Sequence, residues 1–168
     1  MGDDQVATPA EIDPKEFRRA LGSFVTGVTV ITTQRRTGEY VGLTANSFNS
    51  VSLSPPLVLW SLSLFAPSLP AFQEPPHFGV NILAADQKHL SQQFSRRADD
   101  KFTGVEFKEG VGGVPLLDGA AATFTCRNEF RYYGGDHIIF VGAVLAFEHT
   151  DREPLAFARG QYASLSRA

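Results

Sequence analysis

The sequence predicts a mainly β protein, best described as an antiparallel β-barrel with peripheral helices. The chain contains 14 Phe, 4 Tyr and 15 Gly but only one Met, and aromatic residues favour pleated strands. Segments with strand character outnumber helical segments, and the helical ones interrupt the strands irregularly. A doubly wound parallel sheet is therefore disfavoured, since it needs regular alternation of strands and helices, and an antiparallel barrel fits better.

Length and composition predict one globular domain. The chain has 168 residues, of which 43% are hydrophobic and 20% charged, as in ordinary globular proteins. We expect a flexible N-terminal tail over residues 1–12 and a single domain over residues 13–168. The acidic, polar N-terminus lacks the features of a signal peptide, and no apolar run is long enough to span a bilayer. The sequence therefore favours a cytoplasmic protein without a membrane contact.

Charge and residue spacing disfavour several kinds of site. The formal net charge is −3, so no basic surplus is available for nucleic acid. The single cysteine, Cys126, cannot form an internal disulfide, and the 4 histidines are scattered without ligand-like spacing, so we expect no metal site. No nucleophile elbow, zinc-protease motif, Walker loop or dinucleotide fingerprint is present.

The first third of the chain predicts a helix and a hairpin. Asp13 can cap a helix over about 14–23, with Pro14 in its first turn and Glu16 completing a capping box. Its apolar residues recur at helical spacing. They are Phe17, Ala20, Leu21 and Phe24. Residues 25–33 and 40–45 then predict two strands joined by a polar turn that ends in glycine.

The middle of the chain alternates strands with short helices. Residues 57–62 form a near-continuous apolar run, which predicts a strand buried on both faces, and Pro55-Pro56 is expected to prevent regular pairing before it. A short helix is expected over 68–73 and a strand over 78–83. Asp86 is expected to cap a helix that carries Leu90 and Phe94 on one face.

The last third predicts two long strands. Residues 96–118 are charged and glycine-rich and are expected to form an irregular connection, with a flexible turn at 110–113. Residues 120–130 and 137–149 predict two strands joined by 131–136, and residues 155–157 one last short strand.

Three polar groups are candidate binding elements. Residues 42–56 contain seven Ser, Thr and Asn residues at a strand end and in the loop after it. They could satisfy their own backbone, as in many loops, or form a cradle for a phosphate or a heterocycle edge. Ser61, Ser63 and Ser68 follow the buried strand. Gly134-Gly135-Asp136-His137 enters the last long strand, where His137 is either a surface turn residue or a usable donor beside a ligand.

Together these segments resemble the flavin reductase domain family. The resemblance rests on T-A-N-S-F at 44–48, V-S-L-S-P-P-L-V at 51–58, F-G-V-N-I-L at 78–83 with Gln87, Leu90, Ser91 and Phe94, Lys101-Phe102, G-G-D-H at 134–137 and R-G-Q-Y at 159–162. It runs from about Phe17 to Tyr162 in the family's order. It implies a split, Greek-key-like β-barrel that forms a homodimer and binds FMN, with FAD possible. It also implies reduction of that flavin by NADH, with NADPH possible, and transient supply of reduced flavin to a partner oxygenase.

The resemblance also implies roles for individual residues. Flavin binding is expected of Thr44, Ala45, Asn46, Ser47, Ser61, Leu62, Ser63, Ser68, Ser95 and Lys101. Nicotinamide binding is expected of His137, Arg159 and Tyr162, and His137 is the catalytic candidate. The nearest residues to an arginine cluster for a 2′-phosphate are Arg96-Arg97, so the sequence favours NADH. Trp60 departs from the smaller residues usual in its strand, and it either faces the core or narrows the flavin site.

Three other functions stay open at this point. A related split-barrel enzyme could oxidise a small molecule with bound FMN, as the pyridoxamine-phosphate-oxidase-like proteins do. The same fold could bind flavin or haem without turnover, or the chain could be a purely structural dimer. Fold analogy alone does not decide among them.

Overall fold

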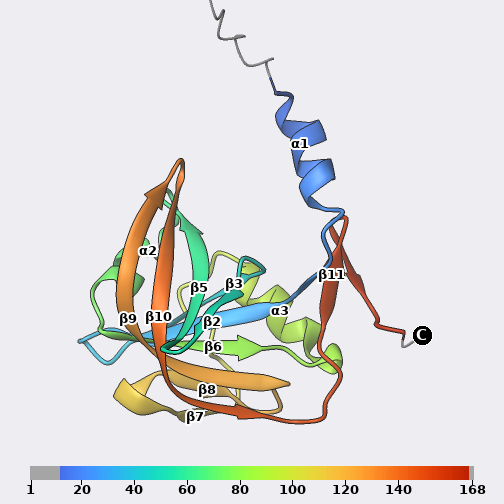
Figure 1. Cartoon of the computed structure of the whole chain (residues 1–168). Coiled ribbons are helices and arrows are strands. Elements are labelled where there is room, and N and C mark those ends of the chain that lie inside the picture. Colours follow the sequence, from blue (N-terminus) through green and yellow to red (C-terminus); the bar gives the residue numbers. More distant parts are fainter. Residues whose placement is uncertain (1–11, 167–168) are drawn as a thin grey trace, which may run out of the picture.

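A computed structural model describes residues 12–166 and is dominated by one antiparallel sheet (Figure 1). The sheet has seven strands in the order β3-β2-β6-β9-β10-β5-β4, and every adjacent pair is antiparallel. The predicted mainly β class is confirmed. The predicted N-terminal tail lies almost wholly outside the described residues. The seven strands are β2 (Thr29–Gln34), β3 (Tyr40–Ala45), β4 (Asn49–Leu53), β5 (Pro56–Ser63), β6 (His77–Ile82), β9 (Ala122–Gly134) and β10 (His137–His149).

The sheet curls around a shared core. Ile31 on β2 and Val58 on β5 belong to one buried cluster, although three strands separate them in the sheet. Trp60 lies at the centre of this core, with its ring stacked 4.7 Å from that of Phe140 and edge-on to Phe72. Trp60 therefore faces the core, the first of its two predicted placements. Within residues 12–166 the edge strands β3 and β4 do not pair, so the barrel-like sheet stays open between them.

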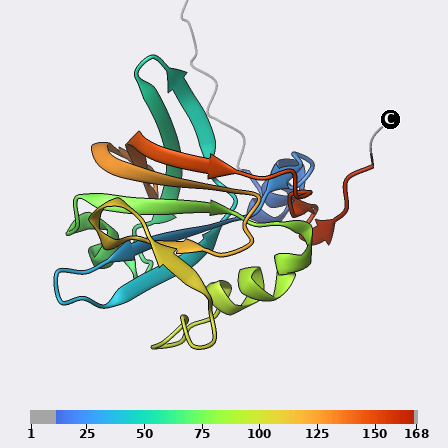
Figure 2. The same cartoon turned by 90° about the horizontal axis from the view of Figure 1, so that it is seen from below.

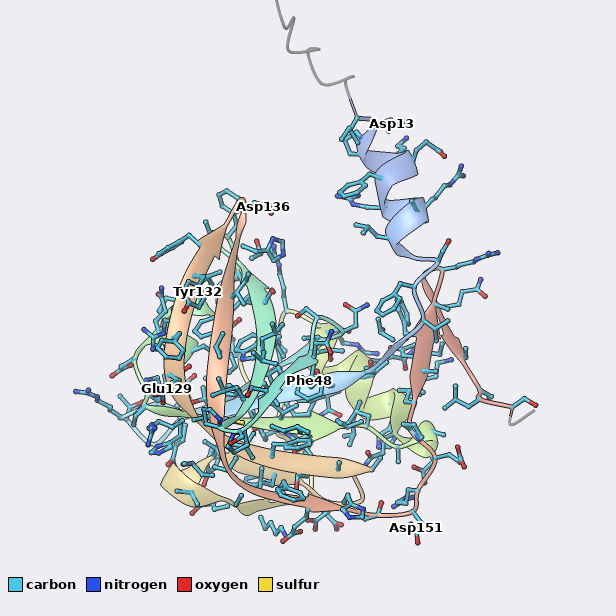
Figure 3. All side chains as sticks on the ribbon, in the orientation of Figure 1. Asp13, Phe48, Glu129, Tyr132, Asp136 and Asp151 are labelled. Carbon is cyan, nitrogen blue, oxygen red and sulfur yellow. The ribbon has the colours of Figure 1, made fainter. Side chains whose placement is uncertain are left out.

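Two long strands bend as they pass through the sheet. The β9–β10 ladder shifts register between Val141 and Gly142 and between Val144 and Ala146. Such bulges increase local twist and bend. The hairpin that joins the two strands reaches the periphery of the molecule, with Asp136 at its tip (Figure 3).

Shorter elements complete the fold. Helix α3 lies along one side of the curled sheet, below β3 when the molecule is turned (Figure 2). The helices are α1 (Pro14–Leu21), α2 (Leu69–Gln73) and α3 (Lys88–Ser95), with 3-10 turns η1 (Ala85–Gln87) and η2 (Val111–Gly113). The remaining strands are β1 (Thr26–Gly27), β11 (Ala156–Ala158) and β12 (Gln161–Ala163) in one small sheet, and β7 (Phe107–Glu109) and β8 (Pro115–Leu117) in another.

Helix α1 stands away from the body of the chain (Figure 1). Asp13 caps it as predicted by accepting a hydrogen bond from the Lys15 amide, whereas Glu16 pairs with Arg19 instead of completing a capping box. The helix buries no residue, and its apolar side chains Phe17 and Leu21 are 52% and 58% exposed. A helix with an apolar face that one chain does not cover is unusual for a monomer.

Two local predictions in the middle of the chain were wrong. Pro55-Pro56 does not prevent pairing before it, because β4 and β5 form a tight hairpin in which Leu53 faces Pro56. The Pro55 nitrogen lies in the turn, where no ladder hydrogen bond is needed. Strand β5 is not buried on both faces: Val58, Trp60 and Leu62 are buried, and the residues between them are half-buried.

The structure differs from the sequence-based expectations at three further places. Asp86 lies inside η1 and pairs with Arg152, so it does not cap α3, whereas Leu90 and Phe94 are buried on one face as predicted. The connection expected over 96–118 contains the β7–β8 hairpin. Strand β12, which has no apolar run to reveal it, pairs with β11.

A close approach fixes α3 against β3. A Cβ at Gly42 would lie 2.6 Å from the Phe94 ring, so the helix can sit this close only because residue 42 lacks a side chain. Val41, Leu43 and Ala45, which alternate with Gly42 and Thr44 along β3, pack against the main core on the other face.

We expect Gly42→Ala to destabilise the fold by about 1–3 kcal/mol, because the added methyl must displace the buried Phe94 ring. The free energy of unfolding in urea measures this. Gly27→Ala is the matched control, since a Cβ there meets no atom within 4 Å, and its effect should stay within about 0.5 kcal/mol. Equal unfolding midpoints for the two variants would show that the close contact is unimportant.

Candidate functional site

Two adjoining cavities lie where α3 meets β3 and the following chain. The smaller measures about 250 Å³ and the larger about 700 Å³, and both are lined by Thr44 and Ser95. Pockets that bind small molecules and cofactors span about 300–1,000 Å³. The shared wall means that groups bound in the two cavities would meet at Thr44 and Ser95.

The smaller cavity combines apolar and polar walls. Val28, Phe157 and Tyr162 form its apolar side, and Thr44 and Asn46 are among its polar groups. The Phe157 and Tyr162 rings meet edge to face at 5.5 Å. Such a slot suits a flat heteroaromatic ring that needs an apolar surface and a few hydrogen bonds.

A hydrogen-bonded chain fixes two walls of this cavity. The Thr44 hydroxyl donates to the Ser91 carbonyl at 2.6 Å, and the Ser91 hydroxyl lies 2.8 Å from the Tyr162 hydroxyl. The Lys88 ammonium lies 5.2 Å from the centre of the Tyr162 ring. Because the Thr44 hydroxyl donates its proton to the Ser91 carbonyl, its oxygen is left as an acceptor in the cavity wall.

The larger cavity is rich in cationic side chains. Arg96, Arg97 and Lys101 line it, and Arg35 at its wall pairs with Glu39 at 3.2 Å. Cations in a partly desolvated cavity are suited to a phosphate group. The polar and cationic lining fits the phosphate end of a nucleotide-like ligand.

Lys101 is the most constrained of these cations. Its ammonium donates to the Gly42 carbonyl at 3.1 Å and to the Phe94 carbonyl at 2.9 Å. These two bonds use two of its three N–H groups and tie the end of α3 to β3. Partial burial lowers the pKa of Lys101 from its ordinary value.

The structure brings most of the predicted binding residues together. They come from β3, β5, the segment before α2, α3, the loop after it, and β12, so residues far apart in sequence share one region. Predicted residues that line the two cavities are Thr44, Ala45, Asn46, Leu62, Ser68, Ser95, Lys101 and Tyr162.

Three predicted serines line neither cavity. The Ser47 hydroxyl accepts from the Ser61 amide at 2.9 Å and donates to the Ser61 carbonyl at 3.1 Å, so it joins the end of β3 to β5. The Ser63 hydroxyl accepts from the Phe65 amide. Strand alternation puts Ser61 and Ser63 on the face opposite the buried Leu62.

His137 also lies outside both cavities of the single chain. It starts β10 at the hairpin tip opposite Ser63, next to the labelled Asp136 (Figure 3). Its Nδ1 lies 2.7 Å from the Asp136 carboxylate, and this contact lowers the pKa of Asp136. The catalytic role of His137 therefore stays a prediction.

Arg159 occupies the turn between β11 and β12. Its φ is 50°, in the left-handed region, and its amide donates to the Gly22 carbonyl at 2.7 Å. Its backbone thus fixes the C-terminal hairpin beside the end of α1, and its side chain lines neither cavity. Its predicted contact with a dinucleotide stays a prediction.

Sequence reasoning missed several lining residues. Val28 and Phe157 were predicted only as strand residues, and Ser91 appeared only as part of a motif. A serine on the apolar face of α3, beside Leu90 and Phe94, was the available signal for Ser91, since a buried hydroxyl needs a partner.

The described residues contain little conventional acid–base or nucleophilic machinery. Cys126 is buried, and burial raises its pKa to about 12, so it is not an activated nucleophile. Over residues 12–166 no cluster of three or more His, Cys, Asp or Glu side chains could hold a metal ion. The arrangement is suited to binding and orienting ligands that carry their own chemistry. In the same range no helix is long and apolar enough to cross a membrane.

Comparison with known proteins identifies what the chain is similar to. The family described as "Flavin reductase like domain" matches residues 21–166. The FMN reductase (NADH) SmoA of Agrobacterium fabrum is 42% identical over 167 residues, which cover 99% of this chain and 95% of that protein. HsaB of Rhodococcus jostii, the reductase subunit of a flavin-dependent monooxygenase, is 41% identical over 165 residues, covering 98% and 84%.

Solved structures agree with these sequence relatives. The NADH:FAD oxidoreductase SgcE6 of Streptomyces globisporus superposes with a TM-score of 0.87 at 39% identity, covering 95% of this chain and 99% of that one. The same protein has been solved in complex with NAD and FAD fragments. Some relatives are longer, and the chain spans about half of their length.

Proposed function

Because the chain belongs to the flavin reductase-like domain family, we propose that it reduces flavin with NADH and supplies the reduced flavin to a partner monooxygenase. The observation that carries this proposal is the pair of cavities that meet at Thr44 and Ser95. A reductase of this kind has to bring two ligands together, and a shared wall between two sites provides that proximity.

The lining residues fit a flavin mononucleotide. Arg96, Arg97 and Lys101 would hold the phosphate, and the polar groups of residues 44–46 would hold the ring and ribityl portion. Bound together, NADH and flavin supply the chemistry as a hydride transfer between their rings. Hydride transfer makes little demand on acid–base groups, so a site that binds and orients its ligands is sufficient for it.

The chain's own residues bind the flavin and NADH and orient them toward each other. The Thr44 oxygen can accept a hydrogen bond from a ligand while its own O–H donates to the Ser91 carbonyl. Tyr162 and Phe157 offer an aromatic wall for the nicotinamide portion, and Lys101 places a positive charge at the other end of the site. Orientation by fixed groups of this kind is the protein's contribution to rate.

An anaerobic assay tests the proposal directly. The protein is mixed with NADH or NADPH and with FMN, FAD or riboflavin, and loss of the oxidised-flavin absorption band is followed. We expect bleaching with NADH and at least FMN or FAD. Binding of FMN without bleaching would instead indicate a flavin carrier, and no binding at millimolar FMN would leave a structural role.

Lys101→Met should weaken FMN binding about tenfold or more, because it removes the constrained positive charge of the larger cavity. Fluorescence titration measures the Kd. Riboflavin, which lacks the phosphate, is the matched ligand, and its Kd should change far less. An equal loss for both flavins would show that Lys101 supports the fold through Gly42 and Phe94 without contacting the phosphate.

We also propose that the chain works as a homodimer. Phe17 and Leu21 lie one helical turn apart and form the exposed apolar face of α1, which one chain leaves uncovered. A second copy is the occupant that fits, since a symmetric pair would cover this face on both chains at once.

Light scattering is expected to give twice the 18.3 kDa chain mass. The double variant Phe17→Ser and Leu21→Ser should shift the protein toward monomer, since it removes apolar area that only a partner would bury. Arg19→Ser on the same helix is the matched control and should leave the dimer intact, because the Arg19 side chain is 79% exposed and pairs locally with Glu16. A monomeric mass for the unaltered protein at micromolar concentration contradicts the proposal.

A further inference from the structure

Ser91 lies between two walls of the smaller cavity. It sits in the middle of α3, fully buried, on the face that also carries Leu90 and Phe94. Its carbonyl accepts from Thr44 on β3, and its hydroxyl bonds to Tyr162 on β12. One residue therefore links a wall from the first third of the chain to a wall from its last ten residues.

Strand β12 is held by its pairing with β11 and by Tyr162, whose ring packs against Phe157 and against a buried cluster that includes Leu90 and Phe94. In its sheet it is an edge strand that pairs with β11, and β11 in turn pairs with the two-residue strand β1. The hairpin is fixed at its base, where the Leu155 amide donates to Leu83, and at its turn, where Arg159 donates to Gly22. Beyond the turn, Tyr162 reaches α3 through the Ser91 hydroxyl and the Lys88 ammonium.

The bond to Ser91 is better placed to hold the strand than the contact with Lys88. Ser91 is rigid because it is buried within a helix, whereas the Lys88 side chain is long and exposed. The hydrogen bond to Ser91 is part-buried and directional, and an exposed cation–π contact contributes less.

We propose that Ser91 is a positioning residue that holds Tyr162, and with it the β11–β12 hairpin, over the smaller cavity. Its hydroxyl sets the width of that cavity by fixing the Tyr162 wall relative to the Thr44 wall. The consequence for catalysis rests on the proposed function: Tyr162 lies on the nicotinamide side, while flavin also keeps its contacts with residues 44–46 and the cations of the larger cavity. Loosening the hairpin therefore weakens dinucleotide binding more than flavin binding.

Hydrogen–deuterium exchange of the unliganded protein tests the positioning role without any assay of activity. Ser91→Ala should raise the exchange rates of the amides of residues 161–163 about three- to tenfold, because the bond to Tyr162 is lost. Tyr162→Phe should raise them similarly. The double variant should be no faster than the faster single variant, since both changes remove the same bond.

Thr33→Val is the matched control. Thr33 also buries a hydroxyl that donates to a backbone carbonyl, that of His77, and it lines neither cavity. It should lower the overall stability and leave the relative exchange at 161–163 unchanged. Unchanged exchange there in Ser91→Ala, or an equal rise in Thr33→Val, overturns the proposal, as do fully additive effects of Ser91→Ala and Tyr162→Phe.

Steady-state kinetics then test the consequence. Ser91→Ala should raise the KM for NADH about three- to tenfold and change kcat and the Kd for FMN less than about twofold. If the unaltered protein does not oxidise NADH with any flavin, the proposed function fails, while the exchange data still decide the role of Ser91. If flavin reduction is confirmed but exchange at residues 161–163 is unchanged in Ser91→Ala, the positioning role of Ser91 is wrong while the proposed function stands.

Discussion

Helix α3 can lie directly on β3 because residue 42 has no side chain, and the candidate site depends on that contact. The Phe94 ring occupies the space that a Cβ at Gly42 would need. At this distance the Thr44 hydroxyl reaches the Ser91 carbonyl, and the Lys101 ammonium reaches carbonyls of both elements. A wider separation would break these three bonds.

The open edge between β3 and β4 lies beside the contact of α3 with β3. Strands β3 and β4 do not pair within residues 12–166, so the outer edge of β3 stays open, and α3 packs on the face of β3 that carries Gly42 and Thr44. Ser47, between β3 and β4, bonds to both backbone groups of Ser61 on β5 and so continues the β4–β5 pairing, in which Asn49 faces Leu59. This explains why a serine predicted to bind flavin is engaged with the backbone.

The chemistry follows from what the cavities offer. Cations outnumber carboxylates in the lining of the larger cavity, while aromatic rings and a few hydroxyls line the smaller one. Such walls bind a phosphate at one end and flat rings at the other, and they provide no nucleophile, since the Cys126 thiol is buried with a raised pKa. A site of this composition contributes position and electrostatics, and its ligands contribute the reaction.

Composition and local pattern determined the mainly β class, the hairpin around residues 34–38, the two long strands, and the family through its motifs. The sequence pattern gave wrong predictions where pairing or burial depends on neighbouring elements. Pro55-Pro56 does not exclude β4 because the proline occupies the turn, and β5 alternates in burial because only one of its faces meets the Trp60 core. Strand β12 lacks an apolar run, and only its pairing with β11 reveals it.

For the site, the sequence by itself supplied the residue types, and most of those it indicated do line the cavities. Only the tertiary structure decided which of these residues line the cavities: Thr44 and Ser95 line both, whereas Ser47 bonds to Ser61 and His137 lies at a hairpin tip. The physical reason is that every Ser or Thr hydroxyl can donate and accept hydrogen bonds, so residue type alone does not identify its partner. Its partner is set by the distance between elements far apart in the chain, and that distance is fixed by core contacts such as Gly42 with Phe94.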